Sequence, residues 1–324
     1  MTQHPMQQFH DLVANILDNG IRESNRTGID TLSLPGQVLR FDLRDGFPAI
    51  TTKKLAFKSA VGELIGFMRG YLSAAQFRQL GCKVWDANAN TTPSWLANPY
   101  RAECGGEDQL GRIYSAQWTD WRDWRAVHSF GESQALIEQG YELIAEDFDR
   151  STYVLRRGIN QLEEVLTKLL TNPTDRRKVI TGWRPDEWDQ AALPSCHTEY
   201  AWQCDTVNRV LHMTMQMRSF DVGLGFNVTL CGLMLAIMAK LSGFTPGSFV
   251  MLINDAHIYV NHVDGMREML SREHYPQPTL HLGDSIPTLT SADQVRGVFT
   301  RIQPDDIKIP DYVSHPRIVL PMAA

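Results

Sequence analysis

The chain has 324 residues, of which 43% are hydrophobic, and its formal net charge at pH 7 is −6. The apolar content allows a substantial core, and the acidic balance disfavours a nucleic-acid partner. The sequence shows no secretory leader and no stretch of about 18 uninterrupted apolar residues, which disfavours secretion and a membrane partner. The five scattered cysteines lack CxxC spacing, which argues against a disulfide framework and a structural zinc site and predicts a cytoplasmic location.

The first part of the chain contains two expected helices with a strand-like segment between them. Residues 7–20 carry apolar side chains at helical spacing, with Gly20 as the expected stop. Residues 31–43 alternate apolar and polar side chains in strand fashion, and the Pro-Gly pair inside them predicts a turn. Helical spacing returns over 58–70, where Glu63 lies among apolar neighbours. A charged residue in that position requires an explanation.

The middle of the chain begins with a polar stretch. The hydrophobic pattern weakens there, and we interpret about 88–158 as an insertion in a single catalytic domain that spans residues 1–324. Residues 159–173 return to helical spacing, and an Asn-Pro pair predicts the end of that helix.

The second half predicts a sheet and a buried helix. Strand patterns cover residues 178–183, 200–207 and 210–217, and the last two predict a hairpin. Residues 228–244 are apolar nearly all round, which is typical of a buried central helix, and Gly243 is its expected C-terminal cap. This mixture predicts an α+β fold in which helices pack on one sheet.

Cys196 is the first candidate for chemistry, since it follows the bend at Pro194 and precedes a predicted strand. A free cysteine is often a small buried hydrophobe, so that alternative stays open beside a nucleophile and a metal ligand. A nucleophilic thiol needs a cation or base nearby; His197 adjoins it, and Arg218 lies one hairpin later. A papain-like site would need a separately placed histidine and asparagine, which nothing in the sequence singles out.

The arginines offer an anion site. Arg176 and Arg177 are adjacent, which is usual for a solvated surface pair. Together with Arg26 and Arg218, however, they could hold one phosphate through charge-assisted hydrogen bonds, and Ser219 could add a hydroxyl.

Polar residues alternate along one further predicted strand. Asp255, His257 and Tyr259 would project from it to the same side, where they could meet a ligand. A metal site is disfavoured there, because His257 and His262 have no carboxylate or cysteine that completes a recognisable ligand set.

In their order and spacing, several stretches resemble the thymidylate synthase family over nearly the whole chain. They are NRTG (25–28), FPAITTKKLAFKSAVGELIGF (47–67), VWD (84–86), IYSAQW (113–118), DRR (175–177), LPSCH (193–197), MRSFDVGLGFN (217–227), DAHIYVNH (255–262) and HPRI (315–318). The resemblance implies an α+β fold with a mixed β-sheet and packed helices, in which the sheet face forms a homodimer. It also implies dUMP as substrate, 5,10-methylenetetrahydrofolate as co-substrate, and no metal.

The resemblance assigns the chemistry to four residues. Cys196 matches the nucleophile that adds to C6 of the dUMP ring. Glu63 matches a buried carboxylate that manages protons through ordered water, and Tyr114 matches a tyrosine that assists removal of the C5 proton. Arg218 completes this catalytic set.

The resemblance also assigns a phosphate clamp. Arg26, Arg218 and Ser219 match its members from the same chain. Arg176 and Arg177 match arginines that reach the site of the partner subunit.

The resemblance assigns recognition of the sugar, the base and the folate to five other residues. His257 and Tyr259 match residues that hold the deoxyribose 3′-hydroxyl. Asn227 matches an amide that reads uracil, which implies dUMP and not a cytosine nucleotide. Trp85 and Asp221 match the wall and the polar anchor of the folate site, over which the C-terminal tail closes.

Several positions depart from the family pattern. Ser195 stands where the family has Pro, TEYAW replaces a stretch with a Gln-Phe pair, and GRIYSAQWT replaces GPVYGxQWR. GLGFN lacks two residues, Asn254 takes a Gly position and Val319 a Lys position. We interpret these departures as clustered at the pocket, where they would change the access of water.

Access of water decides the product. Water capture of the methylene intermediate gives 5-hydroxymethyl-dUMP, hydride capture gives dTMP and dihydrofolate, and about 1.4 kcal/mol changes the partition tenfold. The departures therefore favour a dUMP hydroxymethylase serving DNA base modification, in the host cytoplasm if the source is viral. An ordinary thymidylate synthase is the alternative. A nucleotide-binding regulator is disfavoured, since binding needs neither Cys196 nor Glu63.

Overall fold

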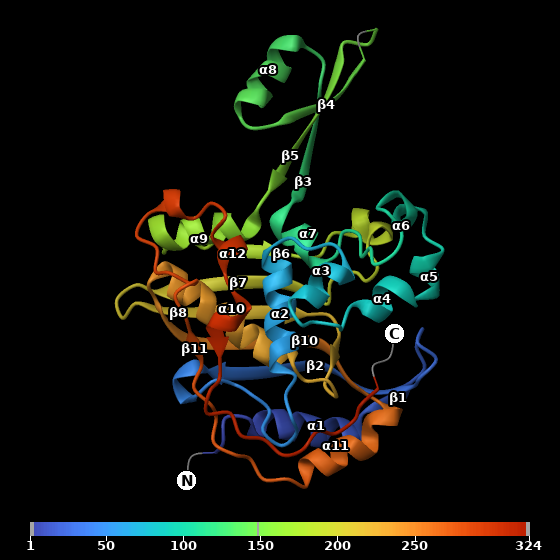
Figure 1. Cartoon of the computed structure of the whole chain (residues 1–324), viewed down its shortest axis with the longest axis vertical. Coiled ribbons are helices and arrows are strands. Elements are labelled where there is room, and N and C mark those ends of the chain that lie inside the picture. The colour runs from blue at the N-terminus through green and yellow to red at the C-terminus, as the bar shows by residue number, and fades with distance from the viewer. Residues whose placement is uncertain (1–2, 148, 322–324) are drawn as a thin grey trace.

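The computed structural model describes residues 3–147 and 149–321. Its centre is a seven-stranded sheet whose main path runs β1–β2–β10–β8–β7–β6, with β9 paired to β10 (Figure 1). Strand β10 runs antiparallel to β2 and parallel to β8, so the sheet is mixed and the expected α+β fold is confirmed. The strands of this sheet are β1 (Ile21–Glu23), β2 (Thr31–Asp42), β6 (Val179–Thr181), β7 (His197–Asp205), β8 (Val210–Met217), β9 (Phe220–Asp221) and β10 (Thr245–Tyr259).

Helix α10 (Asn227–Ser242) is the centre of the core. It contacts β10 and β8 on the sheet and the helices α2 and α9, which explains why its sequence is apolar nearly all round. It ends at Gly243, whose φ of 70° places it in the left-handed region, as the sequence predicts. The other helices are α1 (Gln7–Asn19), α2 (Phe57–Met68), α3 (Ala74–Gln79), α4 (Asp86–Asn90), α5 (Pro93–Leu96), α6 (Pro99–Glu103), α7 (Tyr114–Thr119), α8 (Phe130–Glu138), α9 (Gln161–Thr171), α11 (Val263–Leu270) and α12 (Val298–Arg301).

The turn expected at the Pro-Gly pair is wrong. Strand β2 continues through Pro35 and Gly36 and keeps one register against β10 from end to end. Because β1 covers only Thr31–Ser33, β2 is an edge strand at Pro35, where a missing N–H is tolerated. Gly36 takes a φ of 63°, so the pair bends the strand without reversing it.

A separate arm projects from the body within the expected insertion (Figure 1). It consists of α8 and a three-stranded antiparallel sheet in the order β3 (Trp121–Val127), β5 (Thr152–Ile159), β4 (Glu142–Asp147). The residues between 88 and 119 instead form the short helices α4 to α7 on the body. The division of residues 1–324 into one domain with an insertion at about 88–158 stays a prediction. A further two-stranded pairing joins β11 (His281–Leu282) and β12 (Ile307–Lys308).

One face of the main sheet carries the helices, and the other presents side chains to solvent. Val38 and Leu252 are paired across β2 and β10, and they are 61% and 40% exposed. Val179 on β6 is also exposed. This half-apolar face is a candidate contact surface.

Candidate active site

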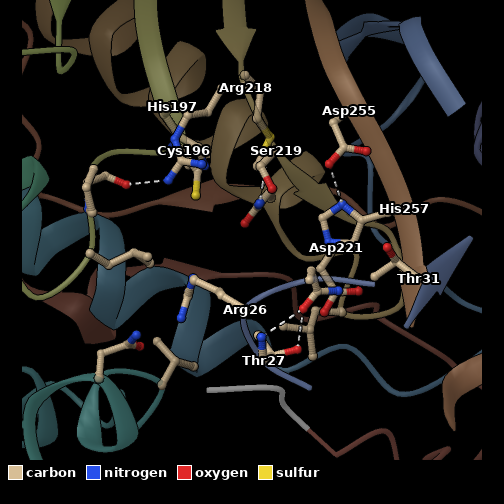
Figure 2. Close-up of a pocket in the computed structure, with 18 of the residues that line it drawn as sticks. Arg26, Thr27, Thr31, Cys196, His197, Arg218, Ser219, Asp221, Asp255 and His257 are labelled. Atoms are coloured by element: carbon tan, nitrogen blue, oxygen red, sulfur yellow. Dashed lines mark hydrogen bonds and ion pairs between the residues drawn. The ribbon is translucent and has the colours of Figure 1, made fainter. Parts of the chain in front are cut away.

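A cavity of about 650 Å³ opens at one end of the sheet. All of the predicted site residues except Arg176 and Arg177 line it, although they come from loops, helices and strands far apart in the chain: Arg26, Glu63, Trp85, Tyr114, Cys196, Arg218, Ser219, Asp221, Asn227, His257 and Tyr259. Figure 2 shows Arg26, Cys196 and Ser219 around one space. The fold therefore brings these candidates together.

Cys196 immediately precedes β7, beside a fixed cation. The guanidinium of Arg218 donates hydrogen bonds to the carbonyls of Pro194 (2.7 Å) and Ser195 (3.0 Å), and the backbone N–H of Arg218 donates to the Cys196 carbonyl (2.9 Å). Figure 2 shows the Arg218 and Cys196 side chains next to each other. The Arg218 guanidinium therefore holds a positive charge beside the candidate nucleophile.

Tyr114 begins α7 and reaches the same loop. Its hydroxyl oxygen accepts the backbone N–H of Cys196 at 2.6 Å. Burial, followed by the neighbouring Cys196, raises the pKa of Tyr114 well above its ordinary value. The phenol therefore keeps its proton and can act as a hydrogen-bond donor toward the cavity.

Glu63 lies on α2 with its side chain buried. Burial raises the pKa of its carboxyl group to about 8, and a hydrogen bond from the Trp85 indole N–H (2.9 Å) partly opposes that shift. The carboxyl group can therefore both give and take a proton near neutral pH.

Three of the five residues predicted for the anion site line the cavity, and two do not. Arg26, Arg218 and Ser219 line the cavity. Arg176 is exposed outside it, and Arg177 forms an exposed ion pair with Asp175 at 2.8 Å.

The alternation predicted at the end of β10 is confirmed. His257 and Tyr259 both line the cavity, with their rings edge to face at a centroid distance of 5.4 Å. His257 Nδ1 lies 3.3 Å from an oxygen of Asp255 without forming a hydrogen bond. These side chains form the polar wall opposite the candidate nucleophile.

Asn227 and Asp221 occupy the third side of the cavity. Asn227 is the first residue of α10, and its amide nitrogen lies 3.9 Å from the sulfur of Met217. Asp221 accepts the backbone N–H of Gly223 at 2.9 Å, and burial raises the pKa of its carboxyl group. Both therefore present polar atoms on rigid backbone.

Two residues near the site are not among the predicted site residues, although the sequence offers His197 as a possible base beside Cys196. Lys53 is buried, and its ammonium group donates to the carbonyls of Gly223 (2.9 Å) and Leu224 (3.1 Å); burial lowers its pKa to about 8. His197 lines the cavity next to Cys196. Lys53 lies in the polar run TTKK (51–54), which gives no local signal of a buried lysine, whereas adjacency to the cysteine was the signal for His197.

Most of the departures from the family pattern lie outside the cavity lining, so the expected cluster at the pocket is wrong. Arg112, in GRIYSAQWT, is buried in an ion pair with Glu187, and Ser195 is buried behind Cys196. Asn254 and Val319 are exposed. The GLGFN stretch contributes Leu224, Phe226 and Asn227 to the cavity lining, and GRIYSAQWT contributes Tyr114, which itself matches the family pattern.

Within residues 3–147 and 149–321, no group of three or more His, Cys, Asp or Glu side chains has the geometry to hold a metal ion. No helix in that part of the chain is both long enough and apolar enough to cross a membrane.

Comparisons with known proteins converge on one family. The family model described as thymidylate synthase matches residues 7–324. A thymidylate synthase of Pseudomonas syringae pv. tomato is 41% identical over 98% of this chain and all of the relative. A thymidylate synthase of Bordetella parapertussis is 42% identical over the same shares, and one of Vibrio cholerae serotype O1 is 33% identical, again over 98% of this chain and all of the relative.

Proposed function

The chain belongs to the thymidylate synthase family, and we propose that it is a thymidylate synthase. In this proposal it transfers a one-carbon unit from 5,10-methylenetetrahydrofolate to C5 of dUMP and releases dTMP and dihydrofolate. The observation that carries the proposal is the position of Cys196 beside Arg218 and Tyr114, in one cavity with the buried Glu63. Binding alone would require neither the activated thiol nor the protonatable carboxyl group.

The chemistry starts at Cys196. Its thiolate adds to C6 of the pyrimidine, which turns C5 into a carbon nucleophile, and Arg218 stabilises the thiolate before addition. Glu63 exchanges protons with the ring through water, since its pKa of about 8 lies near neutral pH. Tyr114, which stays protonated, assists loss of the C5 proton by hydrogen bonding to the water that removes it. C5 bonds to the methylene carbon of the folate, and tetrahydrofolate leaves as the C5 proton is lost. Hydride transfer from tetrahydrofolate to that methylene carbon, with departure of the thiolate from C6, then gives dTMP and dihydrofolate.

Recognition of dUMP divides among three walls of the cavity. Arg26, Arg218 and Ser219 hold the phosphate by charge-assisted hydrogen bonds. His257 and Tyr259 hold the deoxyribose hydroxyl, as their shared orientation on β10 supports.

The base is read by Asn227. Its amide can donate to one pyrimidine oxygen and accept from the ring N–H, a pattern that fits uracil. The rigid start of α10 supports this role, because it fixes the amide relative to Cys196.

The folate donor occupies the side of the cavity near Trp85 and Asp221. A smaller cavity of about 140 Å³ shares Leu224 and Phe226 with the main one, and the tail residues Ile318 and Leu320 close it. The position of the tail at this smaller cavity, beside the main one, supports the exclusion of water during the final hydride transfer.

Two findings favour the synthase over the hydroxymethylase. The full-length relatives that are 41–42% identical are named thymidylate synthases. The residues expected to change water access, such as Ser195 and Arg112, lie outside the cavity lining. Hydride capture therefore has more support than water capture.

Product analysis tests this proposal. The protein is incubated with dUMP and 5,10-methylenetetrahydrofolate, and the nucleotide is identified by mass while dihydrofolate absorbance is followed. We expect a product heavier by one CH₂ group, with one dihydrofolate per nucleotide. A product that also carries one additional oxygen, without dihydrofolate, would establish the hydroxymethylase, and unchanged dUMP would contradict both enzymes.

The active unit in this proposal is a homodimer. The exposed sheet face around Val38 and Leu252 supports this, because burying it removes apolar side chains from water. The exposed position of Arg176 and Arg177, outside their own cavity, supports their reaching the phosphate site of the partner subunit.

Mixing inactive variants tests the shared site. One protein carries Cys196→Ser and the other carries Arg176→Ala with Arg177→Ala. After subunit exchange, a mixed dimer has one site with native residues from both chains, so activity should recover toward about a quarter of the native sites. Absence of recovery, with mixed dimers detected by mass, would place both arginines outside the partner's site.

A further inference from the structure

Tyr200 lies behind His197 on the same strand, β7. Its hydroxyl oxygen lies 2.9 Å from Nδ1 of His197, and both side chains are buried. The thiol of Cys231 on α10 is also near this hydroxyl. Tyr200 belongs to TEYAW, one of the stretches that depart from the family pattern, so the resemblance assigns no role to this hydroxyl.

The protonation states of the neighbours are set by burial. Burial lowers the pKa of His197 to about 4, so the imidazole is neutral at pH 7 and carries one N–H. Burial also raises the pKa of Cys231 far above its ordinary value, so this residue keeps its S–H. Three groups in a row therefore hold one proton each.

Two arrangements of these protons are possible, and they differ in whether the tyrosine hydroxyl, as a hydrogen-bond donor, has an acceptor. If Tyr200 donates to His197 Nδ1, the tyrosine proton has an acceptor at hydrogen-bond distance. If His197 donates instead, the tyrosine proton needs a second acceptor, and this hydroxyl has no other hydrogen-bond partner among the described residues. The first arrangement is favoured, since unmet donors are costly in a buried site.

The first arrangement leaves the proton of His197 on Nε2. This nitrogen has no hydrogen-bond partner among the described side chains and backbone groups, and His197 lines the cavity. The ring meets that of Tyr114 edge to face at 5.4 Å, close to the candidate acid–base residues. We propose that Tyr200 is a positioning residue that holds His197 in the tautomer whose Nε2–H points into the cavity.

The consequence for catalysis rests on the proposed function. A neutral, fixed N–H donor in this wall would hold the water or pyrimidine oxygen that exchanges protons with Glu63. Loss of the Tyr200 hydroxyl would free both tautomers, and in one of them an acceptor would face the same oxygen.

The tautomer can be measured without any substrate. In the full-length protein labelled with ¹⁵N-histidine, long-range ¹H–¹⁵N spectra distinguish the two neutral forms, and His197→Gln identifies the signals of this residue. We expect the Nε2–H form in the native protein and a mixture, or the Nδ1–H form, in Tyr200→Phe. Tyr141→Phe, which removes a hydroxyl from the arm, should leave the His197 signals unchanged.

The outcomes separate this inference from the proposed function. An Nδ1–H form in the native protein overturns the inference, even if Tyr200→Phe does not fold. A pure Nε2–H form that persists in a folded Tyr200→Phe also overturns it. In the dTMP assay we expect kcat of Tyr200→Phe to fall about three- to tenfold, with the KM for dUMP changed less. Absence of dTMP from the native protein would defeat the proposed function and leave the tautomer result standing.

Discussion

Two buried glutamates show how the cavity differs from the root of the arm. Glu63, in the cavity, receives one hydrogen bond from the neutral indole of Trp85 and has no ion-pair partner among the described residues. Glu187, at the root of the arm, pairs with the buried Arg112 and lies 3.6 Å from nitrogens of two further arginines. In the proposed function, the same side chain thus serves proton exchange where it is unpaired, whereas the paired one stabilises the fold.

The paired glutamate also joins the arm to the segment before the nucleophile. Arg112 donates to the backbone carbonyl of Asp120, directly before the arm, and Glu187 lies in η2 (Pro185–Gln190), which leads to Cys196. The Arg112 N–H bonds to the Gln190 carbonyl at 2.7 Å, so the segments that carry Tyr114 and Cys196 run side by side.

The first prediction tests the proton exchange proposed for Glu63. Glu63→Gln keeps the size of the side chain and can still accept from Trp85, but it cannot exchange a proton. We expect kcat to fall about 10²- to 10⁴-fold, with thermal stability at neutral pH no lower than that of the native protein. Steady-state kinetics and thermal unfolding measure the two effects. An equal fall in kcat in Glu187→Gln would contradict the proposed difference between the two glutamates.

The second prediction concerns pH. The pKa of Glu63 is raised from 4.5 to about 8 in the folded protein, so folding favours the protonated form. Its contribution to stability is therefore full below about pH 4 and is lost as pH rises through 8, with an upper bound of about 5 kcal/mol. Denaturant unfolding from pH 5 to 8.5 should show a fall in stability that is absent from Glu63→Gln; parallel curves for the two proteins would contradict the unpaired state of Glu63.

The third prediction concerns Glu187. Glu187→Gln removes the buried carboxylate from Arg112 and leaves it only the part-exposed Asp120 as an ionic partner, so we expect a loss of about 3 kcal/mol in the free energy of unfolding. The double variant with Arg112→Met should recover part of that loss, because no buried charge is left unpaired. Urea titrations measure both, and kcat should change less than threefold if the pair acts through stability.

The sequence predicts the helices of this protein better than the contacts between side chains that are far apart in the chain. Helices α1, α9 and α10 follow local periodicity and end signals, which is why the sequence predicts them. The pairing of Arg112 with Glu187 joins residues far apart in the chain, and no local pattern reports it. The same limit misled the interpretation of Arg112 and Ser195 as pocket residues, since sequence proximity to Tyr114 or Cys196 does not decide which way a side chain points.

A smaller effect should follow from changing the base reader. Asn227→Asp offers a carboxyl group in place of the amide, which fits the amino group of cytosine better than the oxygen of uracil. We expect the ratio of kcat/KM for dUMP over dCMP to fall about 10- to 100-fold, as competing-substrate assays would measure. An unchanged ratio would remove Asn227 from base recognition.

The smallest effect is expected on the arm. Ile144 lies on β4 with half of its side-chain surface exposed, and Ile144→Thr keeps the β-branched shape. Stability should change by less than about 0.5 kcal/mol, and kcat should not change. A large loss of activity would show that the arm's surface contributes to the site, which would weaken the contrast between the two regions.

The central claim is that Cys196 forms a bond to the nucleotide while the folate carbon is transferred. Peptide mass spectrometry after incubation with 5-fluoro-dUMP and 5,10-methylenetetrahydrofolate tests it directly, because the C5 fluorine cannot leave as a proton and the intermediate accumulates. The account predicts one peptide, containing Cys196, that carries both nucleotide and folate. An adduct on another cysteine, or none in a preparation that converts dUMP to dTMP, would contradict it.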